Sequence, residues 1–188
     1  MVDALEANGE LDNTLIIYTS DNGYFNGEHR IRASKAHIYE ESIRVPLEMR
    51  GPGIPQGVTV NPLVINADLA PTILGVASAA RPGLVMDGRS LVPVAQRPGV
   101  ERGRELLIEQ PPRSDPGSGS FEAIRTESYM YAEHDTGERE LYHLQGDPFE
   151  LQNLDGDPGY ADVEAQLADQ LAGLQTCAGA TCLVHSEP

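Results

Sequence analysis

A short apolar stretch that ends in a polar turn does most to restrict the fold of this chain. Residues 15–20 are rich in β-branched and aromatic side chains and too few for a helix, so they predict a buried β-strand over 14–19. The turn Asp21-Asn22-Gly23 follows at once. In α/β sheets, ligands bind outside the carboxyl ends of the strands. The oxygens of Asp21 and Asn22 are hard ligands of the kind that calcium or magnesium prefers.

The chain's one lysine stands close to this turn in the sequence. Twelve arginines accompany the single Lys35, so a lysine at this position is a compositional outlier. A lysine ammonium is a compact point charge, and the planar fork of arginine does not simply replace it. Lys35, Asp21 and Asn22 therefore predict an anion site beside a divalent metal. This prediction requires the three side chains to converge in space.

The charge of the chain is unevenly distributed. The formal net charge is −16, yet all five basic residues of the first 60 fall between Arg30 and Arg50. A basic cluster in an acidic protein favours a local anion site, whereas nucleic-acid binding requires a broad basic face, so nucleic acid is not expected as a partner. The alternative is that these arginines pair with nearby glutamates, as we expect for Arg44 with Glu40 or Glu41. No apolar run approaches the length of a membrane span.

Two cysteines lie close together near the end of the chain. Cys177 and Cys182 are too few for a structural zinc site, which takes four ligands. A small disulfide loop is the preferred interpretation, and it would indicate an oxidising compartment. Two free thiols are the alternative.

The remaining pattern predicts an α/β protein with two parts, residues 1–103 and 104–188. The first part combines the strand at 14–19 with a second short strand at 46–50 and short helices. The second part alternates short strands with turns and ends in one helix after Asp157-Pro158, whose apolar stripe packs on the sheet. The stripe consists of Val163, Leu167, Leu171 and Leu174, and the predicted strands lie at 106–108, 121–125, 129–133 and 140–144.

Several segments in order resemble the second half of the sulfatase family. They extend over nearly all 188 residues, and the closing Cys-x4-Cys is similar to the glucosamine-6-sulfatase branch. The first group is Asp21-Asn22-Gly23-Tyr24, Gly27-Glu28-His29-Arg30, Lys35, Tyr39-Glu40-Glu41-Ser42-Ile43-Arg44-Val45-Pro46-Leu47 and Arg50-Gly51-Pro52-Gly53. The second group is Asp68-Leu69-Ala70-Pro71-Thr72, Glu140-Leu141-Tyr142, Asp147-Pro148-Phe149-Glu150-Leu151 and Asn153-Leu154.

This resemblance implies a fold and a chemistry. Sulfatases fold like alkaline phosphatase, with a large mixed sheet between helices and a small C-terminal antiparallel sheet packed by one helix. They bind one Ca²⁺ ion and use a formylglycine, made from a cysteine, to cleave sulfate esters of sugars or aryl groups. By resemblance, Asp21 and Asn22 match two of the calcium ligands, and Lys35 matches the lysine that contacts the sulfate and the leaving oxygen. His29 matches a position that contacts the sugar, protonates the leaving group, or only supports the site.

The resemblance covers only the family's second half. The Cys-x-Pro-x-Arg segment that holds the nucleophile is not found in these residues. We therefore expect a fragment of an exported sulfatase that is inactive alone and self-associates through an exposed sheet edge. Two alternatives remain open. One is a phosphodiester or phosphonate hydrolase of the same superfamily, and the other is a non-catalytic module that binds anionic sugars or a protein partner through residues 22–50.

Overall fold

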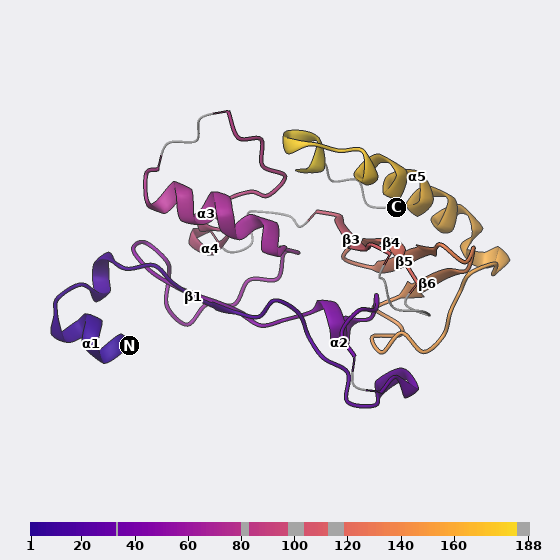
Figure 1. The fold of residues 1–188 in the computed structure, drawn as a ribbon, viewed down its shortest axis with the longest axis horizontal. Helices are drawn as coiled ribbons and strands as arrows, with labels where there is room; N and C mark the ends of the chain where they lie inside the picture. The colour runs from indigo at the N-terminus through magenta and orange to yellow at the C-terminus, as the bar shows by residue number, and fades with distance from the viewer. Residues whose placement is uncertain (33, 80–82, 98–103, 113–118, 184–188) are drawn as a thin grey trace.

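The computed structural model describes residues 1–32, 34–79, 83–97, 104–112 and 119–183. The molecule is elongated, with a two-stranded ribbon toward one end and a four-stranded sheet under the long helix α5 at the other (Figure 1). The predicted α/β class is confirmed. The predicted division between residues 103 and 104 borders residues 98–103, which lie outside the described part, and it remains a prediction.

The N-terminal part is built around the ribbon. Helix α1 (Val2–Ala7) and a 3₁₀ turn η1 (Leu11–Asn13) precede strand β1 (Ile16–Thr19), which pairs antiparallel with β2 (Leu47–Arg50). Both strands were predicted, but the expectation that the first is buried was wrong. Its Tyr18 side chain is 64% exposed, and none of its four residues is buried. In the described part of the chain the strand belongs to a two-stranded ribbon, which is too small to bury a sheet face of its own.

Short helices fill the sequence between and after these two strands. The sequence prediction of short helices in this part is confirmed, among others, by a 3₁₀ turn and an α-helix that together extend over residues 66–76. It did not predict α4, which begins with a proline near its first turn. The elements are η2 (Glu28–Arg30), α2 (Glu40–Ile43), η3 (Asn66–Asp68), α3 (Leu69–Val76) and α4 (Val92–Gln96).

The C-terminal part is a four-stranded antiparallel sheet in the order β3-β4-β5-β6, followed by one long helix. All four strands and the helix were predicted within a few residues of their observed bounds. They are β3 (Leu106–Gln110), β4 (Phe121–Arg125), β5 (Tyr129–His134), β6 (Arg139–His143), η4 (Pro158–Tyr160), α5 (Ala161–Gln175) and η5 (Gly179–Leu183).

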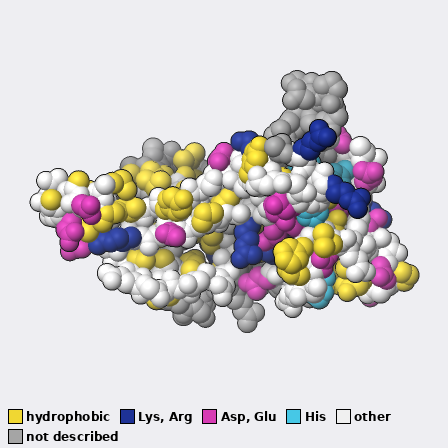
Figure 2. All heavy atoms as spheres, turned by 90° about the horizontal axis from the view of Figure 1, so that it is seen from below, with side chains coloured by type: hydrophobic (Ala, Val, Ile, Leu, Met, Phe, Trp, Pro, Cys, Tyr) yellow, Lys and Arg dark blue, Asp and Glu magenta, His cyan; other side chains and the backbone are white. Residues whose placement is uncertain are grey.

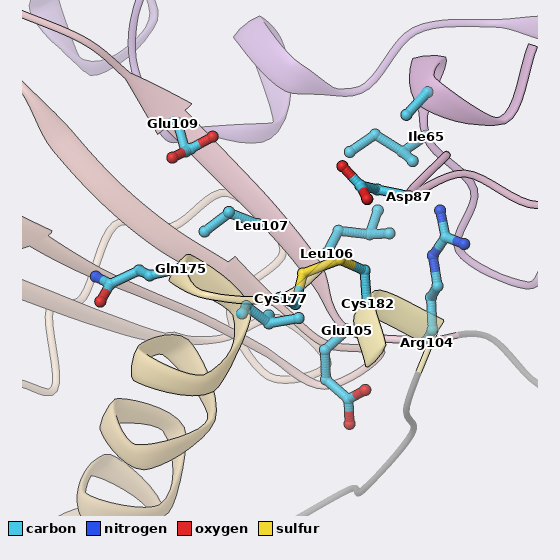
Figure 3. Close-up of a pocket in the computed structure, with 12 residues that line it drawn as sticks. Ile65, Asp87, Arg104, Glu105, Leu106, Leu107, Glu109, Gln175, Cys177 and Cys182 are labelled. Carbon is cyan, nitrogen blue, oxygen red and sulfur yellow. A yellow bond between two sulfur atoms is a disulfide. The ribbon is translucent and has the colours of Figure 1, made fainter. Parts of the chain in front are cut away.

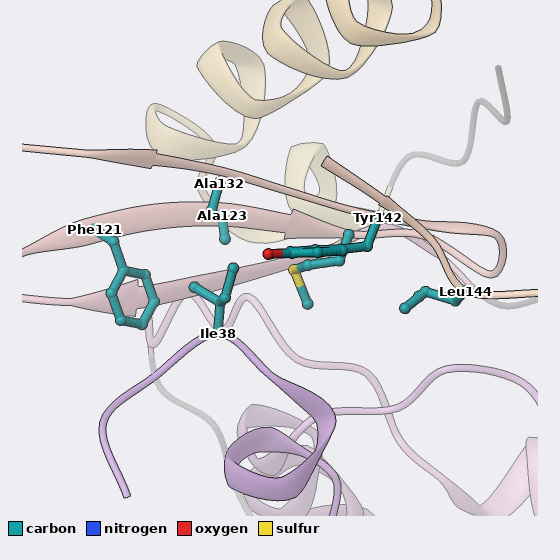
Figure 4. Packing of buried hydrophobic residues seen from close by; sticks show 7 residues of the cluster. Ile38, Phe121, Ala123, Ala132, Tyr142 and Leu144 are labelled. Atoms are coloured by element: carbon teal, nitrogen blue, oxygen red, sulfur yellow. The ribbon is translucent and has the colours of Figure 1, made fainter. Parts of the chain in front are cut away.

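Both faces of this sheet are covered. On one face, Leu167 and Leu171 of α5 pack against Ile124, Tyr131 and Leu141 of the strands, as the apolar stripe of the helix predicted. On the other face, the buried side chain of Ile38, just before α2, packs against a second apolar cluster (Figure 4). That cluster consists of Phe121, Ala123, Met130, Ala132, Tyr142 and Leu144. The C-terminal sheet is therefore packed directly against the segment that leads into α2.

The two cysteines form a disulfide, as predicted. Cys177 and Cys182 are bonded, and the loop that they close packs on the segment before α4, where the Gly179 amide donates to Asp87 Oδ1 at 2.6 Å. Both cysteines border a pocket of about 220 Å³ beside β3, which Arg104 and Asp87 also line (Figure 3). The disulfide loop thus connects the end of the chain to its first part.

Several large apolar side chains of the N-terminal part remain exposed. Met1, Tyr18 and Tyr24 are 83%, 64% and 53% exposed, and apolar side chains are spread over this end of the face in Figure 2. Such a surface favours association, so self-association stays a prediction of this structure. In the part of the chain that the structure describes, no helix is long and apolar enough to cross a membrane.

Candidate functional site

Asp21 and Lys35, two of the three side chains whose convergence the sequence predicts, lie together. The Lys35 Nζ atom is 3.7 Å from Asp21 Oδ2, an ion-pair distance across fourteen residues of sequence. The two side chains are 52% and 80% exposed, so the pair is open to solvent and to ligands. An exposed pair of this kind contributes little to stability.

Hydrogen bonds hold the turn after β1 in place. The Ser20 hydroxyl donates to the Asn22 carbonyl at 2.9 Å and closes the turn. The Asn22 side-chain NH₂ group donates a hydrogen bond to the Gly23 carbonyl at 2.7 Å. This bond does not use the Oδ1 atom of Asn22, whose lone pairs can bind a cation. Asn66 adds a hydrogen bond from its NH₂ group to the Asp21 carbonyl at 3.2 Å.

Gly23 permits a very close approach between this turn and α2. Its amide donates to the Ser42 carbonyl at 2.8 Å. A Cβ atom at this position would lie 2.0 Å from the Glu41 carbonyl oxygen, so a side chain cannot fit without backbone movement. The glycine of the Asp-Asn-Gly turn is therefore required by packing rather than by an unusual backbone angle.

Replacing Gly23 with alanine is expected to lower the free energy of unfolding by about 1–3 kcal/mol, because the methyl group must push the turn away from α2. Urea unfolding monitored by circular dichroism measures this. The matched control is Gly173→Ala in α5, where an added Cβ meets nothing within 4 Å. That change should stabilise the chain by up to about 1 kcal/mol. Equal effects of the two substitutions would contradict the close approach.

Hydrogen bonds to backbone carbonyls hold the segment that carries Lys35. The Phe25 amide donates to the Ser34 carbonyl at 2.9 Å, and the Ser42 hydroxyl donates to the Lys35 carbonyl at 2.7 Å. The side chain of Lys35 is thus half-exposed while its backbone is attached to α2. This arrangement directs one ammonium group to the Asp21 carboxylate.

His29 lies in an aromatic cluster beside α2. Its ring stacks on Tyr39 with a centroid distance of 3.9 Å, and Phe25 meets it edge-on at 6.2 Å. Its Nε2 atom is 3.6 Å from Glu41 Oε2, and the side chain is 10% exposed. The described contacts of His29 are therefore to Tyr39, Phe25 and Glu41, and its predicted part in catalysis stays a proposal.

The C-terminal sheet holds α2 from the other side. The Glu40 amide donates to Glu150 Oε2 at 2.8 Å, and Arg125 Nε donates to Glu40 Oε1 at 2.8 Å. The Tyr39 hydroxyl donates to Glu140 at 2.9 Å. Burial first, and the Glu140 carboxylate second, raise the pKa of Tyr39 to about 12, so its hydroxyl remains a donor at neutral pH. Glu40 also pairs with Arg44 at 3.5 Å, as predicted.

Glu150 is an ionisable group inside this contact. Its side chain is 2% exposed, and burial raises its pKa to about 7, with the Glu40 and Glu41 carboxylates adding to the increase. The Glu40 amide and the Arg125 guanidinium act in the opposite direction. The group that caps α2 therefore changes charge near neutral pH.

The side chains present are suited to a hard divalent cation but are too few to hold one alone. Asp21 and Asn22 offer two oxygens, whereas Ca²⁺ takes six to eight. Within the described residues, no group of three or more His, Cys, Asp or Glu side chains is placed to hold a metal ion. This chain can supply part of a coordination shell that other ligands must complete.

Sequence reasoning did not find the residues that hold the site in place. Arg125 and Glu150 have no local pattern that indicates their partner Glu40, because 85 and 110 positions separate them from it. Ser42 bonds to Lys35, seven positions earlier, in a contact that belongs to no regular helix or strand pattern. Ser42 and Glu150 had one signal, because both belong to segments that carried the family resemblance.

Comparisons with known proteins agree with this arrangement. The chain is 35% identical to N-acetylglucosamine-6-sulfatase of Homo sapiens over 97% of its own length and 39% of that protein. It is 34% identical to N-acetylglucosamine-6-O-sulfatase of Bacteroides thetaiotaomicron, covering 93% of this chain and 32% of that one. The chain thus spans well under half the length of these relatives.

Solved structures of related enzymes superpose on nearly the whole chain. A protein bound to its substrate D-glucosamine-2-N,6-O-disulfate superposes with a TM-score of 0.84 at 34% identity, covering 93% of this chain and 36% of that one. A phosphonate monoester hydrolase of Agrobacterium radiobacter superposes with a TM-score of 0.80 at 29% identity, covering 99% and 42%. The family described as N-sulphoglucosamine sulphohydrolase, C-terminal, matches residues 27–177. The chain therefore belongs to this family and, with it, to the sulfatases.

Proposed function

We propose that this chain forms the lysine and metal-ligand part of an enzyme that hydrolyses sulfate esters of sugars. The observation that carries the proposal is the 3.7 Å approach of Lys35 Nζ to Asp21 Oδ2 in an open position. It places a fixed positive charge beside a carboxylate that suits a divalent cation. An anionic ester that binds there meets both.

Lys35 stabilises the charge that develops when the ester bond breaks. Negative charge builds on the ester oxygens in the transition state, and a preorganised ammonium group lowers its energy. Asp21 and Asn22 contribute two ligands to the Ca²⁺ ion that the family resemblance implies. A bound divalent cation supplies Lewis-acid polarisation of the ester oxygens. His29 is the candidate contact to the sugar or the leaving oxygen.

The nucleophile of this proposal comes from outside these residues. Cys177 and Cys182 are both in the disulfide, so neither is a candidate for the formylglycine of the family. We therefore propose that a formylglycine on another segment completes the active site, and that these 188 residues alone do not turn over a sulfate ester. The division of the chain into 1–103, which carries the site, and 104–188, which supports it, is part of the same proposal.

A phosphonate or phosphodiester hydrolase is the second candidate, and the similarity to a phosphonate monoester hydrolase favours it. The two candidates share the cation and metal chemistry and differ in the ester. Sugar sulfates are the first choice because the N-acetylglucosamine-6-sulfatases match nearly the whole chain. A non-catalytic anion-binding module is the third candidate.

The experiment uses the single lysine as a reporter. In protein labelled with ¹³C-lysine, one Cε–Hε signal is expected, and it belongs to Lys35. With Ca²⁺ present, glucosamine-6-sulfate should shift this signal, and unsulfated glucosamine at the same concentration should not. No shift with the sulfated sugar would count against the proposal, and a larger shift with a phosphonate ester would favour the second candidate.

In the enzyme completed by its nucleophile segment, Lys35→Met should lower kcat/KM for the sulfated sugar by roughly 100- to 1000-fold, the effect of losing one transition-state contact. The matched control is Arg44→Met, because Arg44 is 79% exposed and pairs with Glu40. It removes the same charge from a nearby surface and should change kcat/KM by less than about twofold. Equal losses in the two variants would mean that Lys35 acts only through net charge.

A further inference from the structure

Ser42 is bonded to both segments that carry the candidate site. Its hydroxyl donates to the Lys35 carbonyl at 2.7 Å, and its own carbonyl accepts the Gly23 amide at 2.8 Å. The residue is 3% exposed, and its hydroxyl bond to Lys35 is partly buried. Within the described contacts, one buried residue therefore joins the Asp21 turn to the Lys35 segment.

These two bonds do not belong to an ordinary helix interior. Helix α2 has four residues, so the Ser42 carbonyl lies in its last turn, where carbonyls have no partner within the helix. The hydroxyl donates to a residue seven positions earlier, outside the helix, instead of to the preceding turn of its own helix. The Ser42 hydroxyl also lies 3.5 Å from the His37 amide, which donates to it.

The helix that carries Ser42 is held in place from the C-terminal part of the chain. Glu150 and Arg125 bind Glu40 at the start of the same helix, both at 2.8 Å. Tyr39, just before the helix, is bonded to Glu140. A helix fixed at its beginning presents Ser42 at a defined position, and two loops are attached to that position.

We propose that Ser42 is a positioning residue that sets the distance between the Lys35 ammonium and the Asp21 carboxylate. The proposal rests on the proposed function for the role of these two groups, but the positioning itself is a geometric property of the chain. Without the hydroxyl, the Gly23 bond remains because it uses the backbone carbonyl. The Lys35 backbone then loses its hydrogen bond to α2, and its ammonium moves more freely relative to Asp21.

The test is a double-mutant cycle read at the Lys35 Cε–Hε signal of the full chain at one pH. In the otherwise unchanged protein, Asp21→Asn removes the charge beside the ammonium and should shift the signal. In the Ser42→Ala background the same change should shift it by about half as much or less, because the two groups are no longer held together. A shift of equal size in both backgrounds, or none in the unchanged protein, would overturn the proposal.

A second buried hydroxyl serves as the matched control. Thr72 is fully buried, donates to the Asp68 carbonyl at 2.6 Å and accepts the Leu91 amide at 2.8 Å, away from Lys35. Thr72→Val should leave the response of Lys35 to Asp21→Asn unchanged. Ser42→Cys, which keeps the shape of the side chain with a somewhat larger and weaker donor, is the second variant and should give an intermediate response.

The Lys35 signal distinguishes the proposed function from the positioning role of Ser42. If the sulfated sugar leaves the Lys35 signal unmoved while the cycle shows coupling through Ser42, the proposed function fails and the positioning holds. If the sugar shifts the signal and Ser42→Ala leaves the cycle unchanged, the positioning fails and the proposed function holds.

Discussion

Replacing Arg104 with methionine is expected to lower the free energy of unfolding by about 3–5 kcal/mol. Arg104 Nη2 lies 2.7 Å from Asp68 Oδ1, and the two side chains are 3% and 0% exposed. Asp68 also accepts the amides of Arg89 and Ile65 at 2.8 and 3.0 Å. Methionine leaves this carboxylate buried without its cation, and that uncompensated charge accounts for the loss.

Urea unfolding measures this effect, and two further variants test its cause. Arg44→Met removes an arginine that is 79% exposed and should cost less than about 1 kcal/mol. Adding Asp68→Asn to Arg104→Met removes the buried charge while keeping an acceptor oxygen, so the double variant should be more stable than Arg104→Met alone. If Arg104→Met costs no more than Arg44→Met, the buried pair does not stabilise the fold.

Replacing Glu150 with glutamine is expected to remove a loss of stability between pH 4.5 and pH 7. In the folded chain the pKa of Glu150 is raised from 4.5 to about 7, mainly by burial. The unfolded chain therefore ionises first as the pH rises. The contribution of Glu150 to the free energy of unfolding is therefore largest below pH 4.5, and it falls as the pH rises to the pKa of about 7 in the folded chain. This difference between the two pKa values corresponds to about 3 kcal/mol.

Glutamine keeps the oxygen that accepts the Glu40 amide and does not ionise. Glu150→Gln should therefore be about as stable as the unchanged chain at pH 4, and more stable by up to about 3 kcal/mol at pH 8. Urea unfolding at both pH values measures this. Glu48→Gln, at an exposed position of β2, is the matched control and should leave the pH dependence unchanged. A Glu150→Gln variant with the pH dependence of the unchanged chain would contradict the raised pKa.

Much of the C-terminal part follows from local sequence patterns. The strands β4 and β5 alternate or concentrate apolar residues and are separated by clear turns, so their positions are readable from the chain itself. The stripe of α5 and the disulfide are equally local features. The approach of Lys35 to Asp21 was predicted from the polar turn that ends the strand and from the single lysine of the chain, and the family resemblance implied the same two residues.

Other features depend on contacts that no local pattern contains. The Arg104–Asp68 pair connects residues 36 apart, and the bond between Glu40 and Glu150 connects residues 110 apart. Helix α4 lies in a stretch rich in glycine, proline and arginine, whose composition indicates a loop. Tyr18 could not be judged exposed or buried from its strand pattern, because its burial depends on which elements pack against its face of the ribbon.

The attachment of α2 to the last third of the chain has a consequence for biosynthesis. Glu40 leaves the ribosome well before Glu150 is translated, because 110 positions separate them. Closing so long a loop carries an entropic cost that precedes any gain from the contact. The contact that caps α2 can therefore form only after Glu150 has been translated, and a nascent chain that stops before Glu150 has a helix α2 without this hydrogen bond.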